Sequence, residues 1–249
     1  MRAPGTNRDT ETAFAFQQAG AVTENARVAE LVSGAKKLTD YQILVFAGGF
    51  SYGDDLGAGK VQASELVMKL SDDLALYIER GGLMMGICNG FQIMVKAGIL
   101  PGPLASGMGQ TATLTNNDSG RFECRWTYLA ANKKSRCLFT QGIDLIYAPV
   151  AHGEGKFVAP PEVMENVDAA LYYADADGNP CTTYPDCPSG SLRGIAGITD
   201  TTGRIFGLMP HPEDNIHNQH HPRWTRGEAE LAGSGLKIFH NAVDWVKRS

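Results

Sequence analysis

Short apolar runs alternate with segments of helical spacing in the first hundred residues. Residues 10–21, 61–82 and 91–98 have apolar side chains at helical intervals, and each segment has a glycine at or next to its end. The short runs at 40–50 and 83–87 predict buried strands, the first of which ends in two glycines. A strand, helix, strand, helix order predicts a parallel sheet with helical crossovers.

The second half of the chain has a different pattern. Residues 121–130 and 194–210 alternate apolar and polar positions, and the second segment contains Asp-Thr-Thr-Gly, a hairpin turn signal. The final segment, 235–249, fits an amphipathic helix. The sequence therefore predicts an α/β fold with a mostly parallel sheet flanked by helices, to which antiparallel strands are added in the second half.

Length and composition restrict the class of protein. The 249 residues suffice for one large domain, and because the chain shows no internal repeat or linker we expect a single domain over residues 1–249. The net charge of −5 argues against a nucleic-acid partner. No apolar run approaches the length of a membrane span, and residues 1–11 do not resemble a signal peptide. Five cysteines without a CxxC pair favour a reducing cytoplasm over a disulfide framework or zinc ribbon.

The stretch Gly86-Ile87-Cys88-Asn89-Gly90 joins a predicted strand to a predicted helix. The Gly-x-nucleophile-x-Gly spacing is typical of a sharp turn that exposes one reactive side chain at the end of a sheet. The start of a helix favours a thiolate there, and the following N–H, from Asn89, is placed to stabilise an oxyanion. The alternative is a buried core cysteine beside flexible glycines.

A thiolate nucleophile requires a base that is held in orientation, and "GLMPHPEDN" (207–215) offers one. His211 and Glu213 are two residues apart in a segment stiffened by prolines, so in an extended chain both side chains point the same way. Cys88, His211 and Glu213 together match a nucleophile–base–carboxylate arrangement. Taken alone, a histidine between prolines is more often a residue of a surface turn.

A glycine-rich stretch, "FAGGFSYGDD" (46–55), also follows a predicted strand. Glycines at such a point expose main-chain N–H groups that suit an oxyanion hole. The stretch lacks the Gly-Lys-Ser/Thr ending of a phosphate loop, and its simplest alternative is an ordinary turn.

These motifs together resemble a known family. The stretch from Gly86 to Gln92 and the sequence His211-Pro212-Glu213 resemble the nucleophile motif and the His-x-Glu pair of the class I, triad-type glutamine amidotransferases, which have a flavodoxin-like fold. Within that family, several stretches are similar to the glutaminases of phosphoribosylformylglycinamidine synthase in purine biosynthesis: "APGTNRDTE", "GGFSYGDDLGAGK", "GICNGFQIM", "HGEGKF" and "LMPHPE".

The resemblance implies a mechanism and a set of roles. Cys88 attacks the side-chain amide of L-glutamine, His211 transfers protons, Glu213 orients His211, ammonia leaves, and water hydrolyses the thioester. Gly49, or its neighbour Phe50, and Asn89 supply the oxyanion N–H groups, and Gln92 helps to hold the substrate.

The resemblance also implies partners. A synthase subunit receives the ammonia. A small accessory subunit of the same complex is a candidate third component. ATP and Mg²⁺ are expected on the synthase, so neither a cofactor nor a metal is expected on this chain. The alternatives are another cysteine hydrolase of the same fold, such as a peptidase-like relative, and a catalytically silent subunit that only binds a synthase.

Three segments leave questions open. Only Met1 precedes the "R-x-P-G-T-N" stretch, so the first strand is expected to be truncated. The segment 152–157, "HGEGKF", fits an active-site rim, a partner interface or an exposed polar edge. In the segment 215–228, the spacing of its three histidines would suit a metal if the segment were helical, whereas an exposed polar loop or a partner-docking loop fits its composition better.

Overall fold

The computed structural model of the chain describes residues 1–102, 109–227 and 229–248. Its α-helices are α1 (Asp9–Gln18), α2 (Val28–Val32), α3 (Lys60–Glu79), α4 (Asn89–Lys96), α5 (Pro161–Met164) and α6 (Leu236–Arg248). Its strands are β1 (Ile43–Phe46), β2 (Leu83–Ile87), β3 (Thr113–Thr115), β4 (Glu123–Ala131), β5 (Leu145–His152), β6 (Lys156–Val158), β7 (Asp168–Ala174), β8 (Ile195–Thr199) and β9 (Ile205–Leu208).

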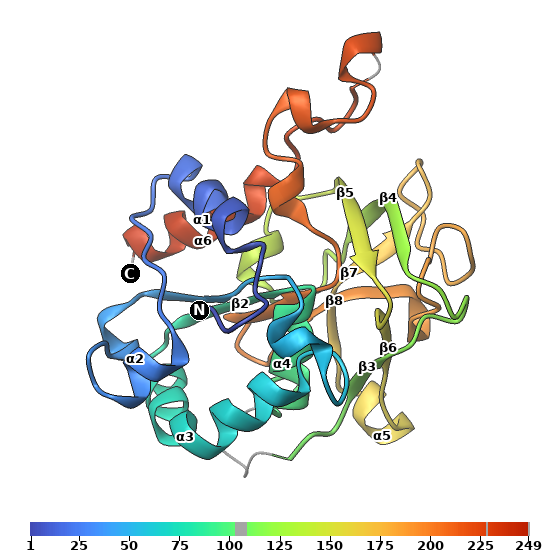
Figure 1. Cartoon of the computed structure of the whole chain (residues 1–249). Helices are drawn as coiled ribbons and strands as arrows, with labels where there is room; N and C mark the ends of the chain where they lie inside the picture. The colour runs from blue at the N-terminus through green and yellow to red at the C-terminus, as the bar shows by residue number, and fades with distance from the viewer. Residues whose placement is uncertain (103–108, 228, 249) are drawn as a thin grey trace.

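Seven strands form one mixed sheet in the order β1-β2-β9-β8-β7-β4-β5, and β3 pairs with β6 in a separate ribbon (Figure 1). The strands β1, β2 and β9 are parallel, whereas every pairing from β9 to β5 is antiparallel. The predicted α/β class with added antiparallel strands is therefore confirmed. The parallel part is smaller than expected, because β7 and the long β4–β5 pair extend the antiparallel side.

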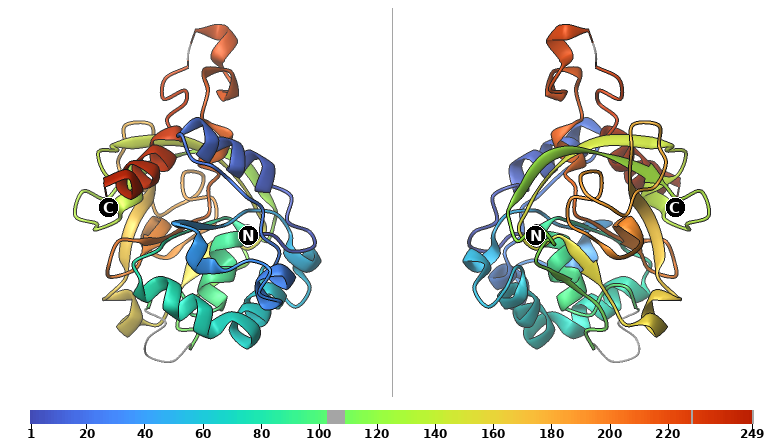
Figure 2. Two further views of the ribbon diagram at one scale, coloured as in Figure 1. Left: turned by 90° about the vertical axis from the view of Figure 1, so that its left-hand side faces the viewer. Right: turned by 90° about the vertical axis from the view of Figure 1, so that its right-hand side faces the viewer.

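Helices cover the parallel part of the sheet on both sides. The views of Figures 1 and 2 place α1 and α6 on one face and α3 and α4 on the other. Phe16 of α1 and Phe239 of α6 pack edge to face, with ring centroids 5.0 Å apart. Because both faces are covered, all five residues of β2 are buried, which explains its continuous apolar sequence.

The helix pattern follows the sequence with small shifts. Helix α6 is amphipathic and buries Ile238, Phe239, Ala242 and Val243 along one stripe. Helix α4 buries every residue from its start to Val95, and it begins at Asn89, two residues earlier than its apolar spacing suggests. The predicted turn at 200–203 does join two antiparallel strands, β8 and β9.

The first residues of the chain lie beside the open edge of β1. The amino group of Met1 donates a hydrogen bond to the Val45 carbonyl oxygen, and Arg2 forms an isolated parallel bridge with Arg27. Burial lowers the pKa of that amino group to about 6, although the negative charge of Asp9 acts to raise it. Residues 1–3 therefore contact the sheet edge without forming a strand of their own.

A segment that follows the 212–214 turn projects away from the body of the molecule (Figure 1). It carries the three histidines of the predicted polar segment, which do not share a helix. His217 and His220 pack edge to face with ring centroids 5.3 Å apart, whereas His221 packs against the ring of Tyr147 at 5.2 Å. Among the described residues, no helix is both long and apolar enough to cross a membrane.

Candidate active site

The turn between β2 and α4 holds Cys88 in a strained conformation. Its backbone has φ 51° and ψ −107°, a region that non-glycine residues rarely adopt. A Cβ atom at Gly90 would lie 1.9 Å from the Phe46 carbonyl oxygen, and one at Gly86 would lie 2.5 Å from the Met94 sulfur. Both flanking glycines are therefore required by close approach, and the predicted elbow is present.

Neighbouring strands fix the position of the elbow. The Cys88 N–H donates to the Leu208 carbonyl oxygen of β9 at 2.8 Å, and the Cys88 sulfur lies 3.7 Å from the Ala151 carbonyl oxygen of β5. Cys88 caps the N-terminus of α4, where the aligned peptide dipoles favour negative charge. Of the five cysteines, Cys124 is exposed, and none forms a disulfide among the described residues.

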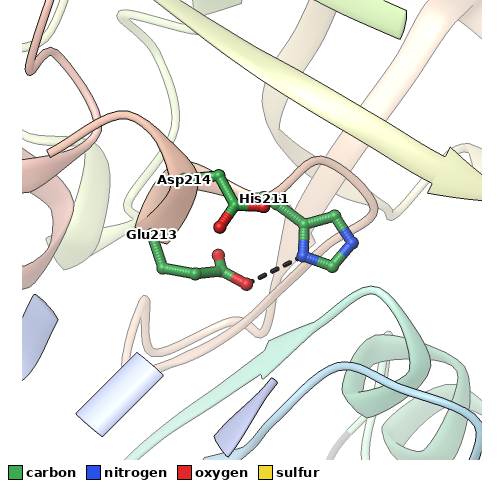
Figure 3. A group of neighbouring side chains, drawn as sticks. All are labelled: His211, Glu213 and Asp214. Carbon is green, nitrogen blue, oxygen red and sulfur yellow. Dashed lines mark hydrogen bonds and ion pairs between the residues drawn. The ribbon is translucent and has the colours of Figure 1, made fainter. Parts of the chain in front are cut away.

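His211 and Glu213 form a buried pair just beyond the end of β9 (Figure 3). The His211 Nδ1 atom lies 2.8 Å from the Glu213 Oε1 atom, and the two residues are 4% and 2% exposed. The main-chain N–H of His211 donates to the Pro149 carbonyl oxygen at 2.8 Å, and this bond joins the turn to β5. Residues 212–214 form a single 3₁₀ turn rather than the extended chain that the sequence suggests. The predicted pair is therefore present, but a tight turn creates it.

The charge state of His211 depends on its two partners. Burial lowers its pKa, but the Glu213 carboxylate and the hydrogen-bonded Cys88 sulfur outweigh burial and hold the pKa well above the usual value. An imidazolium between a carboxylate and a sulfur is the charge distribution that a thiolate nucleophile needs. The predicted Cys88, His211 and Glu213 are thus brought together.

A second carboxylate lies beside this pair. Ligand atoms of His211, Glu213 and Asp214 lie within 4.8 Å of one another, close enough for the three residues to share a metal ion. Asp214 is instead paired with Arg8, and Glu213 is occupied by His211. Burial and Glu213 raise the pKa of Asp214, while His211 and Arg8 oppose that change.

The glycine-rich stretch after β1 lies against the His211 ring. A Cβ atom at Gly48 would be 3.0 Å from the His211 Cε1 atom. Gly49 has φ 136°, and a Cβ atom there would be 2.6 Å from the Asn7 nitrogen, so only glycine fits. The Phe50 N–H already donates to the Gly5 carbonyl oxygen at 3.0 Å, whereas the Gly49 N–H makes no hydrogen bond with another described residue. Gly49 is therefore better placed than Phe50 to offer a free donor.

The side chains of Asn89 and Gln92 face inward rather than toward open space. Asn89 is 1% exposed and Gln92 is 3% exposed. The Gln92 Oε1 atom accepts from Asn89 Nδ2 at 3.0 Å, and Gln92 Nε2 donates to the Glu154 carbonyl oxygen at 2.7 Å. Both ends of the Gln92 amide are thus engaged within the protein, and its predicted contact with substrate stays a prediction.

The sequence left His152, the last residue of β5, with three alternatives: an active-site rim, a partner interface or an exposed polar edge. Its Nδ1 donates to Asn117 Oδ1 at 3.0 Å, because the Asn117 amide nitrogen already donates to two carbonyl groups. Burial and the charge of His211 lower its pKa to about 3, so His152 is neutral. Its buried Nε2 has no partner among the described residues. The "HGEGKF" motif had drawn attention to this residue, but only the fold shows its proximity to His211.

An α/β sheet that carries a cysteine at a strand–helix elbow beside a buried His–Glu pair matches the arrangement expected of the triad-type amidotransferases. A family model described as a CobB/CobQ-like glutamine amidotransferase domain matches residues 1–246. The chain belongs to this glutamine amidotransferase family.

Similarity to individual relatives is more specific than the family match. The chain is 54% identical over 248 residues to a phosphoribosylformylglycinamidine synthase subunit PurQ from Dehalococcoides mccartyi, a match that covers 100% of this chain and 96% of the relative. It is 41% identical over 263 residues to the PurQ subunit of Methanococcus maripaludis, with 100% and 96% covered. Among solved structures, a chain of PurLQS from Thermotoga maritima superposes with a TM-score of 0.75 at 30% identity, and 98% and 96% of the two chains are covered.

Proposed function

We propose that this chain is the glutaminase component of phosphoribosylformylglycinamidine synthase, in which it hydrolyses L-glutamine and delivers ammonia to the synthase subunit for purine (IMP) biosynthesis. The observation that carries the proposal is the strained Cys88 elbow, whose sulfur interacts with a His211 ring that Glu213 holds from the other side. The likeness to the PurQ subunits along the whole chain supports the same assignment.

The chemistry requires only groups on this chain. The Cys88 thiolate attacks the γ-carboxamide carbon of glutamine, and the carbonyl oxygen becomes an oxyanion that accepts hydrogen bonds from the Gly49 and Asn89 N–H groups. His211, as the imidazolium, gives a proton to the departing nitrogen, and ammonia leaves as the C–N bond breaks. The product of this step is a thioester between Cys88 and the γ-carbonyl carbon of a glutamyl group.

A second half-reaction regenerates the enzyme. Neutral His211 takes a proton from water, the hydroxide adds to the thioester carbon, and the same N–H groups stabilise the second oxyanion. The C–S bond breaks, glutamate leaves, and the Cys88 thiolate pairs again with the imidazolium. Glu213 holds the ring through Nδ1, so that the opposite nitrogen serves both proton transfers.

The remaining parts of the proposal concern the setting of the reaction. We place ATP, Mg²⁺ and the phosphoribosyl substrate on the synthase subunit, with a small accessory subunit as a possible third member of the assembly. We place the chain in the cytoplasm as one amidotransferase domain over residues 1–249.

The test is ammonia and glutamate release from L-glutamine, measured with the isolated chain and with synthase subunits present. Release that Cys88→Ala abolishes would support the proposal. Peptide cleavage without glutamine hydrolysis would instead favour the peptidase-like alternative. Binding to a synthase without any hydrolysis, even in the full assembly, would favour a silent subunit.

A further inference from the structure

The loop that follows the predicted oxyanion donor Gly49 is unusually strained. Within residues 51–58, called here the 51–58 loop, three non-glycine residues have left-handed backbone angles: Tyr52 (φ 54°), Asp54 (φ 56°) and Leu56 (φ 61°). Such conformations persist only where surrounding contacts hold them. Segment 4–8 holds one side of Gly49, through the Phe50 N–H to the Gly5 carbonyl oxygen and the bridge from Thr6, and the contacts of the 51–58 loop act on its other side.

One set of contacts comes from the helix that follows Cys88. The buried Asn89 side chain accepts the Ser51 N–H at 3.1 Å and donates to the Asp54 carboxylate at 3.0 Å. The start of α4 thus holds the beginning of the 51–58 loop.

A second set of contacts comes from Glu154, in the segment between β5 and β6. Both oxygens of its carboxylate accept the Ala58 N–H, at 3.2 and 3.3 Å, and Oε2 also accepts from Lys96 Nζ at 3.2 Å. Lys96, at the end of α4, donates further to the Ala58 carbonyl oxygen at 2.6 Å. The Lys96 side chain is 8% exposed and the Glu154 side chain 27%, so this ion pair is partly shielded from water. Glu154 and Lys96 thus hold the far end of the loop.

The same segment also reaches the nucleophile. The Glu154 carbonyl oxygen accepts from Gln92, and the Ala151 carbonyl oxygen contacts the Cys88 sulfur. Residues 151–154 therefore contact both the elbow and the loop.

We propose that Glu154 is a positioning residue for the oxyanion hole: with Lys96 it holds the strained 51–58 loop, and hence the Gly49 N–H, against the Cys88 elbow. This inference deepens the proposed function and rests on it. It gives the "HGEGKF" motif a role at the active site. Glu154 acts through the loop and does not itself touch the reacting atoms.

The same motif offers a matched control. Lys156 lies two residues further along and forms an ion pair with Asp118 at 2.6 Å. This pair is more exposed, and neither of its members hydrogen-bonds to α4 or to the 51–58 loop among the described residues. Lys156→Met therefore removes an ion pair from the same segment without touching the loop.

The experiment compares Glu154→Gln, Lys96→Met, the double variant and Lys156→Met, each assembled with synthase subunits and each checked for an unchanged melting transition. Glutamine turnover gives kcat and KM. Inhibition by glutamate γ-semialdehyde, whose thiohemiacetal with Cys88 places an oxygen in the oxyanion hole, reports on the hole together with the thiolate and substrate binding. Alkylation of Cys88 by iodoacetamide, followed at the Cys88 peptide, reports on the thiolate without using the hole.

Loss of a whole oxyanion donor costs about 10²–10³-fold in kcat, so a displaced donor should cost at least about tenfold. We expect Glu154→Gln and Lys96→Met to lower kcat and semialdehyde affinity by about tenfold or more. KM and the alkylation rate should stay within about twofold of the parent. The two residues share one ion pair but also bond Ala58 separately, so the double variant should be worse than either single variant, with a loss smaller than the product of the two single losses. Lys156→Met should match the parent throughout.

Two results would overturn the inference. One is a Glu154→Gln variant that binds the semialdehyde as tightly as Lys156→Met. The other is a loss of alkylation rate as large as the loss of kcat, which would place the fault at the elbow and not at the hole. Failure of the proposed function has a different signature: the assembled parent binds the semialdehyde but releases no ammonia from glutamine.

Discussion

The main-chain N–H of Cys88 donates a hydrogen bond to the carbonyl oxygen of Leu208, the last residue of β9. The bond joins two parallel neighbours, β2 and β9, at the edge where both strands end. The proposed nucleophile, Cys88, follows one strand directly, and His211 follows the other within three residues. Parallel strands that end together thus bring reactive groups from distant parts of the sequence to one place.

The first prediction concerns the nucleophile. Cys88→Ala should abolish glutamine hydrolysis, because no other described cysteine lies at the elbow beside His211. A glutamine analogue with an alkylating group should label Cys88, as read by mass spectrometry of peptides. Cys124→Ala should keep parent turnover. Parent-level turnover by Cys88→Ala would exclude the thioester mechanism.

The second prediction separates the base from the residue that orients it. His211→Ala removes proton transfer, a contribution of about 10²–10⁴-fold, and should reduce kcat more than Glu213→Gln does. Since Glu213 raises the pKa of His211, Glu213→Gln should also move the alkaline limb of the pH–rate profile to lower pH. Steady-state rates across pH measure both effects. An unmoved alkaline limb would show that Glu213 does not control the charge of His211.

The third prediction concerns stability in acid. His152 has a pKa of about 3 in the folded protein and about 6.5 when unfolded, so the unfolded chain binds the extra proton between these values. His152 therefore contributes stability that is present above pH 6.5 and is lost as the pH falls toward 3, by at most about 1.4 kcal/mol per pH unit.

Urea unfolding of the parent and of His152→Gln between pH 4 and 7 tests this effect. The variant should be less stable at pH 7, because it lacks the imidazole that donates to Asn117 Oδ1. Its free energy of unfolding should fall less steeply than that of the parent as the pH is lowered. Equal slopes for the two proteins would contradict a buried neutral His152.

The fourth prediction concerns Gly49. Gly49→Ala should destabilise the fold and lower kcat, because the added methyl group would meet the Asn7 backbone at 2.6 Å and displace the N–H group. Gly34→Ala is the control, since Gly34 also has a positive φ but has nothing within 4 Å of an added Cβ atom. The control should cost about 1–2 kcal/mol in urea unfolding and leave turnover unchanged. Equal effects of the two substitutions on kcat would show that Gly49 has no role in the oxyanion hole.

The fifth prediction concerns assembly. We expect weak glutaminase activity from the isolated chain and a rise of at least about tenfold with synthase subunits, nucleotide and the phosphoribosyl substrate present. A tenfold rise corresponds to a coupling of about 1.4 kcal/mol, within the usual range for linked sites. The partner would favour the loop conformation in which the oxyanion donors face the substrate. Glutamate formation against added subunits is the measurement, and full activity in the isolated chain would refute the coupling.

Local sequence patterns predicted the parts of this structure that depend on local chemistry. Glycines at 86 and 90 identify the elbow because no side chain fits there, and the apolar run of β2 identifies a strand that is covered on both faces. His211 and Glu213 were identified by their spacing, although a 3₁₀ turn and not an extended chain joins them. The structural role of each of these residues follows from neighbours within a few positions in the sequence.

The missed features depend on contacts between distant segments. The bond from His152 to Asn117 spans 35 residues, and the bond from Gln92 to the Glu154 carbonyl oxygen spans 62. Neither is encoded in a local pattern. The choice between Gly49 and Phe50 likewise required the fold, because only the fold shows that Gly5 occupies the Phe50 N–H. The extent of the antiparallel side was missed because β7 has no strict alternation.

The pairing of Ile87 with Leu208 has a consequence for how the chain can change length. Cys88 follows its strand with no intervening residue, and only two residues separate Leu208 from His211. An insertion in either link would carry one reactive group away from the other, however well the rest of the sheet formed. The outer part of the projecting segment, around the exposed Trp224, lies outside both links, so it can gain or lose residues while the distance between sulfur and imidazole is preserved.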